Sequence, residues 1–106
     1  MAEYLGKAKK AAGLLNVGRV AISQGMNHAN REGGEITPDE MMNALARHRR
    51  GDWGNTCKED GALNTEAMVR GSGRVISSYT SAKGEVFWIE TDADHATTTM
   101  YLPDEY

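Results

Sequence analysis

The last third of the chain alternates apolar and polar residues with a period of two, in three runs that are separated by turn residues. The runs cover residues 74–80, 85–91 and 96–102, and the segments 81–84 and 92–95 lie between them. Period-two alternation is typical of strands, and short connections join strands as antiparallel hairpins. The alternation therefore predicts a three-stranded antiparallel meander, which the rest of the chain must cover.

The clearest helix signal is the capping box Thr37-Pro38-Asp39-Glu40, in which the Thr37 and Glu40 side chains can each bind the other's backbone amide. Pro38 suits the first helical position, and Gly51 follows a basic last turn. The spacing predicts a helix between these points. A polar helix over 24–32 is expected after Ser23, which can cap it.

A second capping box, over residues 56–59, predicts another helix that ends near Arg70, with Leu63 and Ala67 facing inward. Residues 16–23 form a further strand-like run, which we expect at the edge of the meander. The predicted fold class is α+β, with a small antiparallel sheet and about three helices on one face. We expect a single domain over residues 16–106 and a basic, flexible N-terminal arm over residues 1–15.

Charge is distributed unevenly along a chain of 106 residues whose net charge is −3. Residues 1–50 carry eight Lys/Arg and five Asp/Glu, whereas residues 51–106 carry four and ten. This balance argues against simple electrostatic binding to nucleic acid and suits an acidic face for a basic partner.

One cysteine, Cys57, excludes an intramolecular disulfide and suits a reducing compartment. No apolar run approaches the roughly 20 residues that cross a bilayer, and the N-terminal residues lack the apolar region of a signal peptide. We therefore expect a cytoplasmic protein without membrane contact. No cofactor is expected, and no metal either, because the histidines and the cysteine lack paired metal-ligand spacing.

The cluster around His48 is the densest group of polar side chains. His48 could act as a general base, Arg49 could hold a phosphate, and His95 could be a second acid-base group, as in a metal-independent ribonuclease. The structural interpretation is simpler and is favoured. The cations complement the end of the helix, Asp52 caps the next turn, and Trp53 closes the core.

Acidic residues in the turn after the second run and near Tyr106 could face a basic partner, or they could be a solvated turn and tail. The candidate partner-binding set combines these acidic residues with two residues of the turn that follows the helix predicted after Thr37. Its members are Asp52, Trp53, Asp92, Asp94, Asp104 and Glu105. Trp88 and Tyr101 are expected to pair across neighbouring strands, and an exposed pair would suit base stacking or a protein partner.

Residues 45–54 match a pattern of the type LARHxxGDWG, and further segments follow in order through 77–80, 88–89, 91–94 and 98–99 to an LPxEY ending at 102–106. This ordered set resembles a family of short hypothetical proteins encoded on plasmids, prophages and integrative elements. His95 stands where the family tends to have arginine. The resemblance implies a mobile-element context and no established activity.

The leading hypothesis is a non-enzymatic accessory binding protein of a mobile element, which acts on a host or element-encoded protein. Inhibition of host defence, against CRISPR or restriction, would suit its small size and acidic C-terminal half. A small ribonuclease or toxin using His48, Arg49 and His95 is the alternative. A nucleic-acid-binding regulator working through residues 1–50 is a third hypothesis. Oligomeric state does not follow from the sequence.

Overall fold

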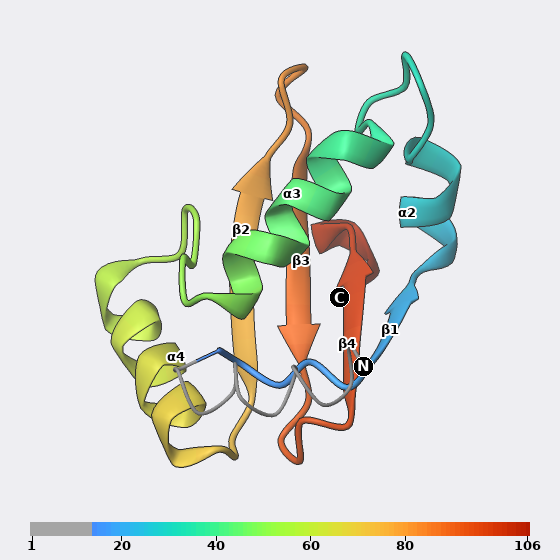
Figure 1. Ribbon diagram of the computed structural model, residues 1–106. Coiled ribbons are helices and arrows are strands. Elements are labelled where there is room, and N and C mark those ends of the chain that lie inside the picture. The colour runs from blue at the N-terminus through green and yellow to red at the C-terminus, as the bar shows by residue number, and fades with distance from the viewer. Residues whose placement is uncertain (1–13) are drawn as a thin grey trace.

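The computed structural model describes residues 14–106 and shows an α+β fold (Figure 1). The predicted arm falls mostly on residues 1–13, which lie outside the described residues. Leu15 is already part of the packed domain, since it is 1% exposed and its amide donates to the Arg49 carbonyl at 2.7 Å. In order, the elements are β1 (Arg19–Ile22), α2 (Gln24–Ala29), α3 (Pro38–Arg49), α4 (Lys58–Arg70), β2 (Val75–Thr80), β3 (Val86–Thr91), β4 (Thr97–Tyr101) and η1 (Pro103–Glu105).

The four strands form one sheet in the order β1-β4-β3-β2. The predicted meander is confirmed, because β2 and β3 pair antiparallel, as do β3 and β4. The strand β1 does join its edge, but it runs parallel to β4, so the sheet is mixed and not wholly antiparallel. A parallel pair needs a long crossover, which the chain makes here through α2, α3, α4 and the other strands.

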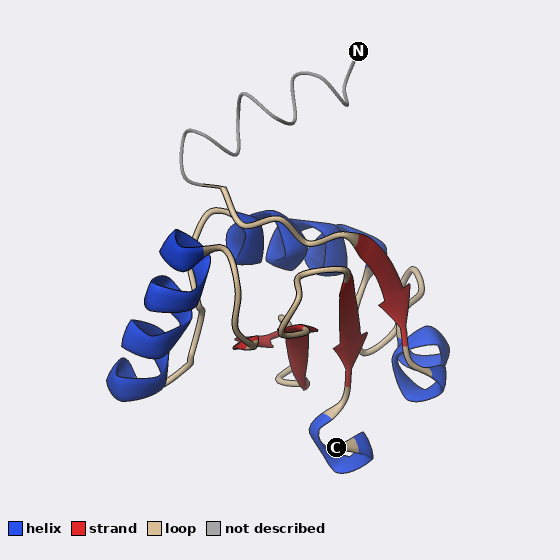
Figure 2. Cartoon of the chain, turned by 90° about the horizontal axis from the view of Figure 1, so that it is seen from below, coloured by secondary structure: helices blue, strands red, loops and turns tan. Residues whose placement is uncertain are grey.

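One face of the sheet carries the core. Alternate residues of β2 and β3 point into it, among them Val75, Tyr79, Phe87 and Ile89, which are all 2% exposed or less. The helix α3 lies across this face, whereas α4 flanks β2 and α2 lies beside the β1–β4 side (Figures 1 and 2). All three expected helices contribute to this side of the sheet, because α3 crosses its middle while α2 and α4 add the buried Met26 and Ala67 to the core clusters. Within residues 14–106 no helix is long and apolar enough to cross a membrane.

The helix α3 begins and ends where its residues predict. The Thr37 hydroxyl accepts from the Glu40 amide at 3.2 Å, and the Glu40 carboxylate accepts from the Thr37 amide at 2.9 Å. Pro38 occupies the first position. The chain leaves the helix through Gly51, whose φ of 85° lies in the left-handed region that favours glycine.

The second helix prediction is right in extent and wrong in two details. Cys57 and not Thr56 caps α4, without a side-chain bond, because the Thr56 hydroxyl donates to the Trp53 carbonyl at 2.7 Å. Leu63 is 61% exposed, and Asn64 is buried in its place. The side chain of Asn64 reaches the backbone of β2, so a polar residue faces the sheet edge where an apolar one was expected.

The helix α2 ends at Ala29, earlier than residue 32. Ser23 caps it as predicted, accepting from the Met26 amide at 3.0 Å. Asn30 then forms a bridge with Ile36, which is fully buried. This bridge draws the chain out of the helical path before the Gly33-Gly34 pair.

Candidate functional site

His48 lies at the centre of a buried polar chain beneath α3. It is 0% exposed, its Nδ1 is 2.6 Å from the Ser77 hydroxyl, and its Nε2 is 2.8 Å from the Thr91 hydroxyl. Thr91 in turn contacts the Thr98 hydroxyl at 2.6 Å, and Thr98 donates its only hydroxyl hydrogen to the Val17 carbonyl. Thr91 must then donate to Thr98 and accept from His48. A neutral His48 therefore carries its proton on Nε2 and accepts from Ser77 at Nδ1.

Burial, with a smaller contribution from repulsion by His95, lowers the pKa of His48 to about 4. The edge of the Trp53 ring closes the remaining side, with ring centroids 5.7 Å apart. His48 is neutral at physiological pH, and both ring nitrogens are occupied within the core. It holds α3 to β2 and β3 and presents no group to solvent.

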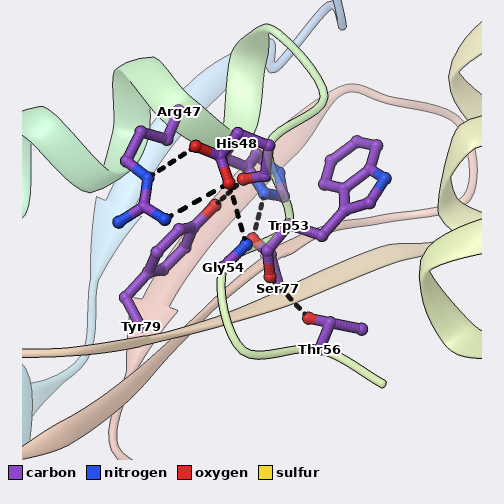
Figure 3. A network of polar contacts seen from close by, with 8 residues as sticks. Arg47, His48, Trp53, Gly54, Thr56, Ser77 and Tyr79 are labelled. Carbon is purple, nitrogen blue, oxygen red and sulfur yellow. Dashed lines mark hydrogen bonds and ion pairs between the residues drawn. The ribbon is translucent and has the colours of Figure 1, made fainter. Parts of the chain in front are cut away.

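The turn after α3 is organised by Asp52, whose partners Arg47, Gly54 and Tyr79 are labelled in Figure 3. Arg47 donates to its carboxylate from Nε at 2.8 Å, and the Gly54 amide donates to Oδ1 at 3.2 Å. The hydrogen bond from Arg47 is the main reason that the pKa of Asp52 lies below its usual range. The Tyr79 hydroxyl donates to the Asp52 carbonyl at 2.8 Å, and the Arg47 guanidinium lies 5.0 Å from the Tyr79 ring centre. Trp53 extends from this turn to α4, where its indole donates to Thr65.

The second histidine of the ribonuclease hypothesis also has a local contact. His95 is 4% exposed, and its Nε2 is 2.8 Å from the Gly73 carbonyl. Because a carbonyl only accepts, Nε2 must carry the proton. Arg49 is half-buried, and among the described residues its Nε has no hydrogen-bond partner. The structure therefore does not place His48, Arg49 and His95 together on an accessible surface.

Two of the predicted acidic contacts shape the turn between β3 and β4. Asp92 Oδ1 accepts from the amides of Ala96 at 3.0 Å and Thr97 at 3.2 Å, and Asp94 accepts from Ala96 at 3.1 Å. These bonds close the turn in which His95 has a φ of 57°. Asp94 remains exposed.

The other two acidic residues lie at the opposite end of β4, because the turn precedes this strand and η1 follows it. Asp104 is exposed. Glu105 accepts from the Ser23 hydroxyl at 2.6 Å and from the amides of Gly25 and Leu102 at 2.9 and 2.8 Å. The six predicted partner-binding residues therefore fall in three turns, two residues in each, and Asp52, Asp92 and Glu105 are engaged within the fold.

The face of the sheet opposite α3 carries an aromatic cluster. Trp88 and Tyr101 are paired in the register of β3 and β4 as predicted, and their ring centroids are 6.0 Å apart at 83°. Tyr106 stacks on Tyr101 at 6.0 Å and meets Trp88 edge-on at 5.5 Å. Glu90 joins this cluster by accepting from the Tyr101 hydroxyl at 2.8 Å and from Arg74 Nε at 2.6 Å. The short turn η1 lies on this side of the sheet (Figure 2).

A groove of about 590 Å³ runs between this face and α4. The helix lines it with Cys57, Asp60 and Leu63, which recur every three residues and so share one helical face. Trp88 lines the groove from β3, and Tyr106, which is 69% exposed, lines it from the chain end. Apolar surface, one carboxylate and one thiol thus meet in a single concave site, which we call the α4 groove.

Sequence reasoning found Trp88 and Tyr101 but missed the α4 groove. The signal in the sequence that could have revealed the groove was Leu63. This apolar residue stands three positions after Asp60, on a helix whose inward side otherwise carries small or polar residues. Cys57 is exposed, and within residues 14–106 no cluster of three or more His, Cys, Asp or Glu side chains is placed to hold a metal ion. Compared with protein-family models, with curated proteins and with solved structures, the chain matches none.

Proposed function

We propose that this chain is a non-catalytic binding protein that holds a partner protein in the α4 groove. The observation that carries the proposal is the groove itself, in which Leu63 is 61% exposed and Trp88 is half-buried beside the exposed Tyr106. Exposed apolar surface of this kind marks interaction sites, and tryptophan and tyrosine are enriched at the centres of protein interfaces.

The charges around the α4 groove favour protein over nucleic acid. Arg74 is the one cation among the residues that line it, and this guanidinium is bound to Glu90 and to the Tyr106 hydroxyl. Nucleic-acid binding depends on Lys and Arg that neutralise phosphates. A phosphate backbone would instead meet the carboxylate of Asp60 and a C-terminal half rich in Asp and Glu.

The resemblance to proteins of mobile elements supports a partner encoded by the host or by the element, in the cytoplasm. A component of a CRISPR or restriction complex is the partner that this proposal puts forward. The ribonuclease alternative gains no support from the two histidines, since His48 and His95 are buried and bonded inside the fold.

The test compares two exposed apolar residues of the same helix. Leu63→Arg places a charge in the α4 groove, whereas Val69→Arg changes a residue that is 80% exposed and does not line it. Proteins that copurify with the wild-type chain from host cells are identified, and survival of a targeted plasmid or phage is counted in cells with active CRISPR or restriction. We expect Leu63→Arg to abolish specific copurification and protection, and Val69→Arg to preserve both. Equal behaviour of the two variants would contradict the proposal.

A further inference from the structure

We infer that the segment bound in the α4 groove carries an apolar side chain and, within one helical turn of it, a lysine or arginine that pairs with Asp60. This inference rests on the proposed function and names the chemistry of the partner. It follows from the charges that line the groove, from the position of Asp60 relative to Leu63, and from the blocked edge of the sheet.

The single cation in the lining is already engaged. Arg74 donates to Glu90 at 2.6 Å and to the Tyr106 hydroxyl, and its guanidinium lies 5.4 Å from the Tyr106 ring centre. The hydrogen bonds to Tyr106 and Glu90 raise the pKa of Arg74, so the charge is kept in every ordinary condition. Arg74 therefore lines the groove with a guanidinium whose charge is already paired with Glu90.

Asp60 is the carboxylate that lines the groove, and unlike Arg74 it has no partner of opposite charge among the described residues. It is exposed in the first turn of α4, and no ion pair or side-chain hydrogen bond involves it among the described residues. An anionic occupant would be repelled here, and a cationic one would be attracted. Because Asp60 and Leu63 are three positions apart on the helix, their side chains lie roughly 5–6 Å apart at Cβ. The same short spacing should relate the cation and the apolar anchor of the occupant.

The partner cannot enter by adding a strand next to β2. The Ser78 carbonyl already accepts from the Asn55 amide at 2.7 Å, and the Ser78 amide donates to the Thr56 hydroxyl at 3.2 Å. Asn64 occupies the next position with bonds of 2.7 and 3.2 Å to the Ile76 carbonyl and amide. With this edge paired, recognition depends on side chains that fill the groove and not on backbone pairing.

The experiment selects peptides from a randomised display library on three immobilised proteins. These are the wild type, Asp60→Lys and Glu59→Lys. The two substituted residues are neighbours, both exposed and both in the first turn of α4, so each change removes one carboxylate that favours the helix N-terminus. Only Asp60 lines the groove. Circular dichroism checks that both variants fold alike.

We expect the wild type and Glu59→Lys to enrich an apolar or aromatic residue with Lys or Arg within four positions of it. Asp60→Lys should enrich Asp or Glu in that place instead. A synthetic peptide from the wild-type selection should bind Asp60→Asn about three- to fivefold more weakly, as for an exposed ion pair. If Asp60→Lys selects the same basic peptides as the wild type, the inference is overturned.

Two further readouts separate this inference from the proposed function. The only thiol, Cys57, lines the groove, so a bound peptide should slow its reaction with a disulfide reagent such as dithionitrobenzoate. Peptides that leave this rate unchanged bind elsewhere, which overturns the inference. The same selection is then run on Leu63→Arg. If this variant enriches no peptides while Asp60→Lys keeps the charge preference of the wild type, the binding groove is retained and the pairing with Asp60 is rejected. If Leu63→Arg and Asp60→Lys both select the same peptides as the wild type, the binding groove and the pairing with Asp60 are both rejected.

Discussion

At the residue scale, the structure gives local roles to side chains that resemble catalytic groups. His48 is bonded to Ser77 and Thr91 inside the core, and His95 is bonded to the Gly73 carbonyl. A buried polar group that has its hydrogen bonds stabilises the fold, whereas the same group without them is costly. Histidine near arginine in the sequence is therefore compatible with a purely structural role.

Stability should depend on pH through His48. Its pKa is lowered from 6.5 to about 4 in the folded chain, so the unfolded chain binds a proton first as the pH falls. The contribution is complete above the unfolded pKa, declines as the pH falls from 6.5 towards 4, and amounts to at most about 3 kcal/mol. Urea unfolding between pH 7.5 and about pH 4.5 measures it. His48→Gln should flatten this decline, whereas the exposed His28→Gln should keep it. An equal decline in both variants would contradict the assignment.

Position 54 requires glycine because the backbone of β2 lies very close to it. A Cβ at this position would lie 2.0 Å from the Ser78 carbonyl oxygen, and the φ is +65°. Gly71 has a φ of +82° with nothing within 4 Å, so it tests the backbone cost alone. We expect Gly54→Ala to lower the free energy of unfolding by about 3 kcal/mol and Gly71→Ala by about 1 kcal/mol, as measured by urea denaturation. Similar losses would show that the approach to Ser78 is unimportant.

At the scale of elements, α4 differs most from the expectation. An apolar residue on a helix usually faces the core, but the inward side of α4 meets the edge of β2, where backbone groups need partners. Asn64 supplies both a donor and an acceptor to Ile76. Leu63 is left on the groove side, where it remains exposed.

Replacing a buried apolar residue usually costs more stability than replacing a polar one. For Asn64 and Leu63 we expect the opposite order. Asn64→Ala leaves the Ile76 amide and carbonyl without partners and should cost about 2 kcal/mol. Leu63→Ala should cost less than about 0.5 kcal/mol, because its side chain is 61% exposed. Thermal and urea unfolding of the two variants measure the difference. A larger loss for Leu63→Ala would mean that α4 packs with its other side inward.

At the scale of the whole molecule, Glu105 links the C-terminal turn η1 to the first turn of α2. Its carboxylate joins η1 to Ser23 and Gly25, which stand 82 and 80 positions earlier. Bonds from these groups lower the pKa of Glu105, with the Ser23 hydroxyl as the largest cause. The link holds η1 beside the aromatic cluster, where Tyr106 forms one wall of the α4 groove.

Glu105→Ala should loosen the C-terminal turn without unfolding the sheet. The amides of Gly25 and Leu102 lose their acceptor, so their hydrogen exchange should become faster. Exchange within β2 and β3 should stay as in the wild type. Asp104→Ala serves as the control, since Asp104 is exposed and its neighbour makes these bonds. Equal acceleration in both variants would argue against a link through Glu105.

Much of the secondary structure could be predicted from the sequence. The three meander strands, the capping box at Thr37 and the short connection over residues 81–84 all agree with the structure. These features depend on groups a few residues apart, whose steric and hydrogen-bonding preferences are local. For the same reason the pairing of Trp88 with Tyr101 followed from counting residues along two strands joined by a short turn.

The direction of β1, the burial of His48 and the α4 groove were decided only by tertiary structure. His48 meets Ser77 across 29 positions, and Thr98 meets the Val17 carbonyl across 81. The sequence determined that α4 exists. If the helix packed against an apolar surface, Leu63 would face inward. The free backbone edge of β2 bound Asn64 instead and left Leu63 beside Asp60 in the groove, because a buried backbone group must find a hydrogen-bond partner wherever the packed chain offers one.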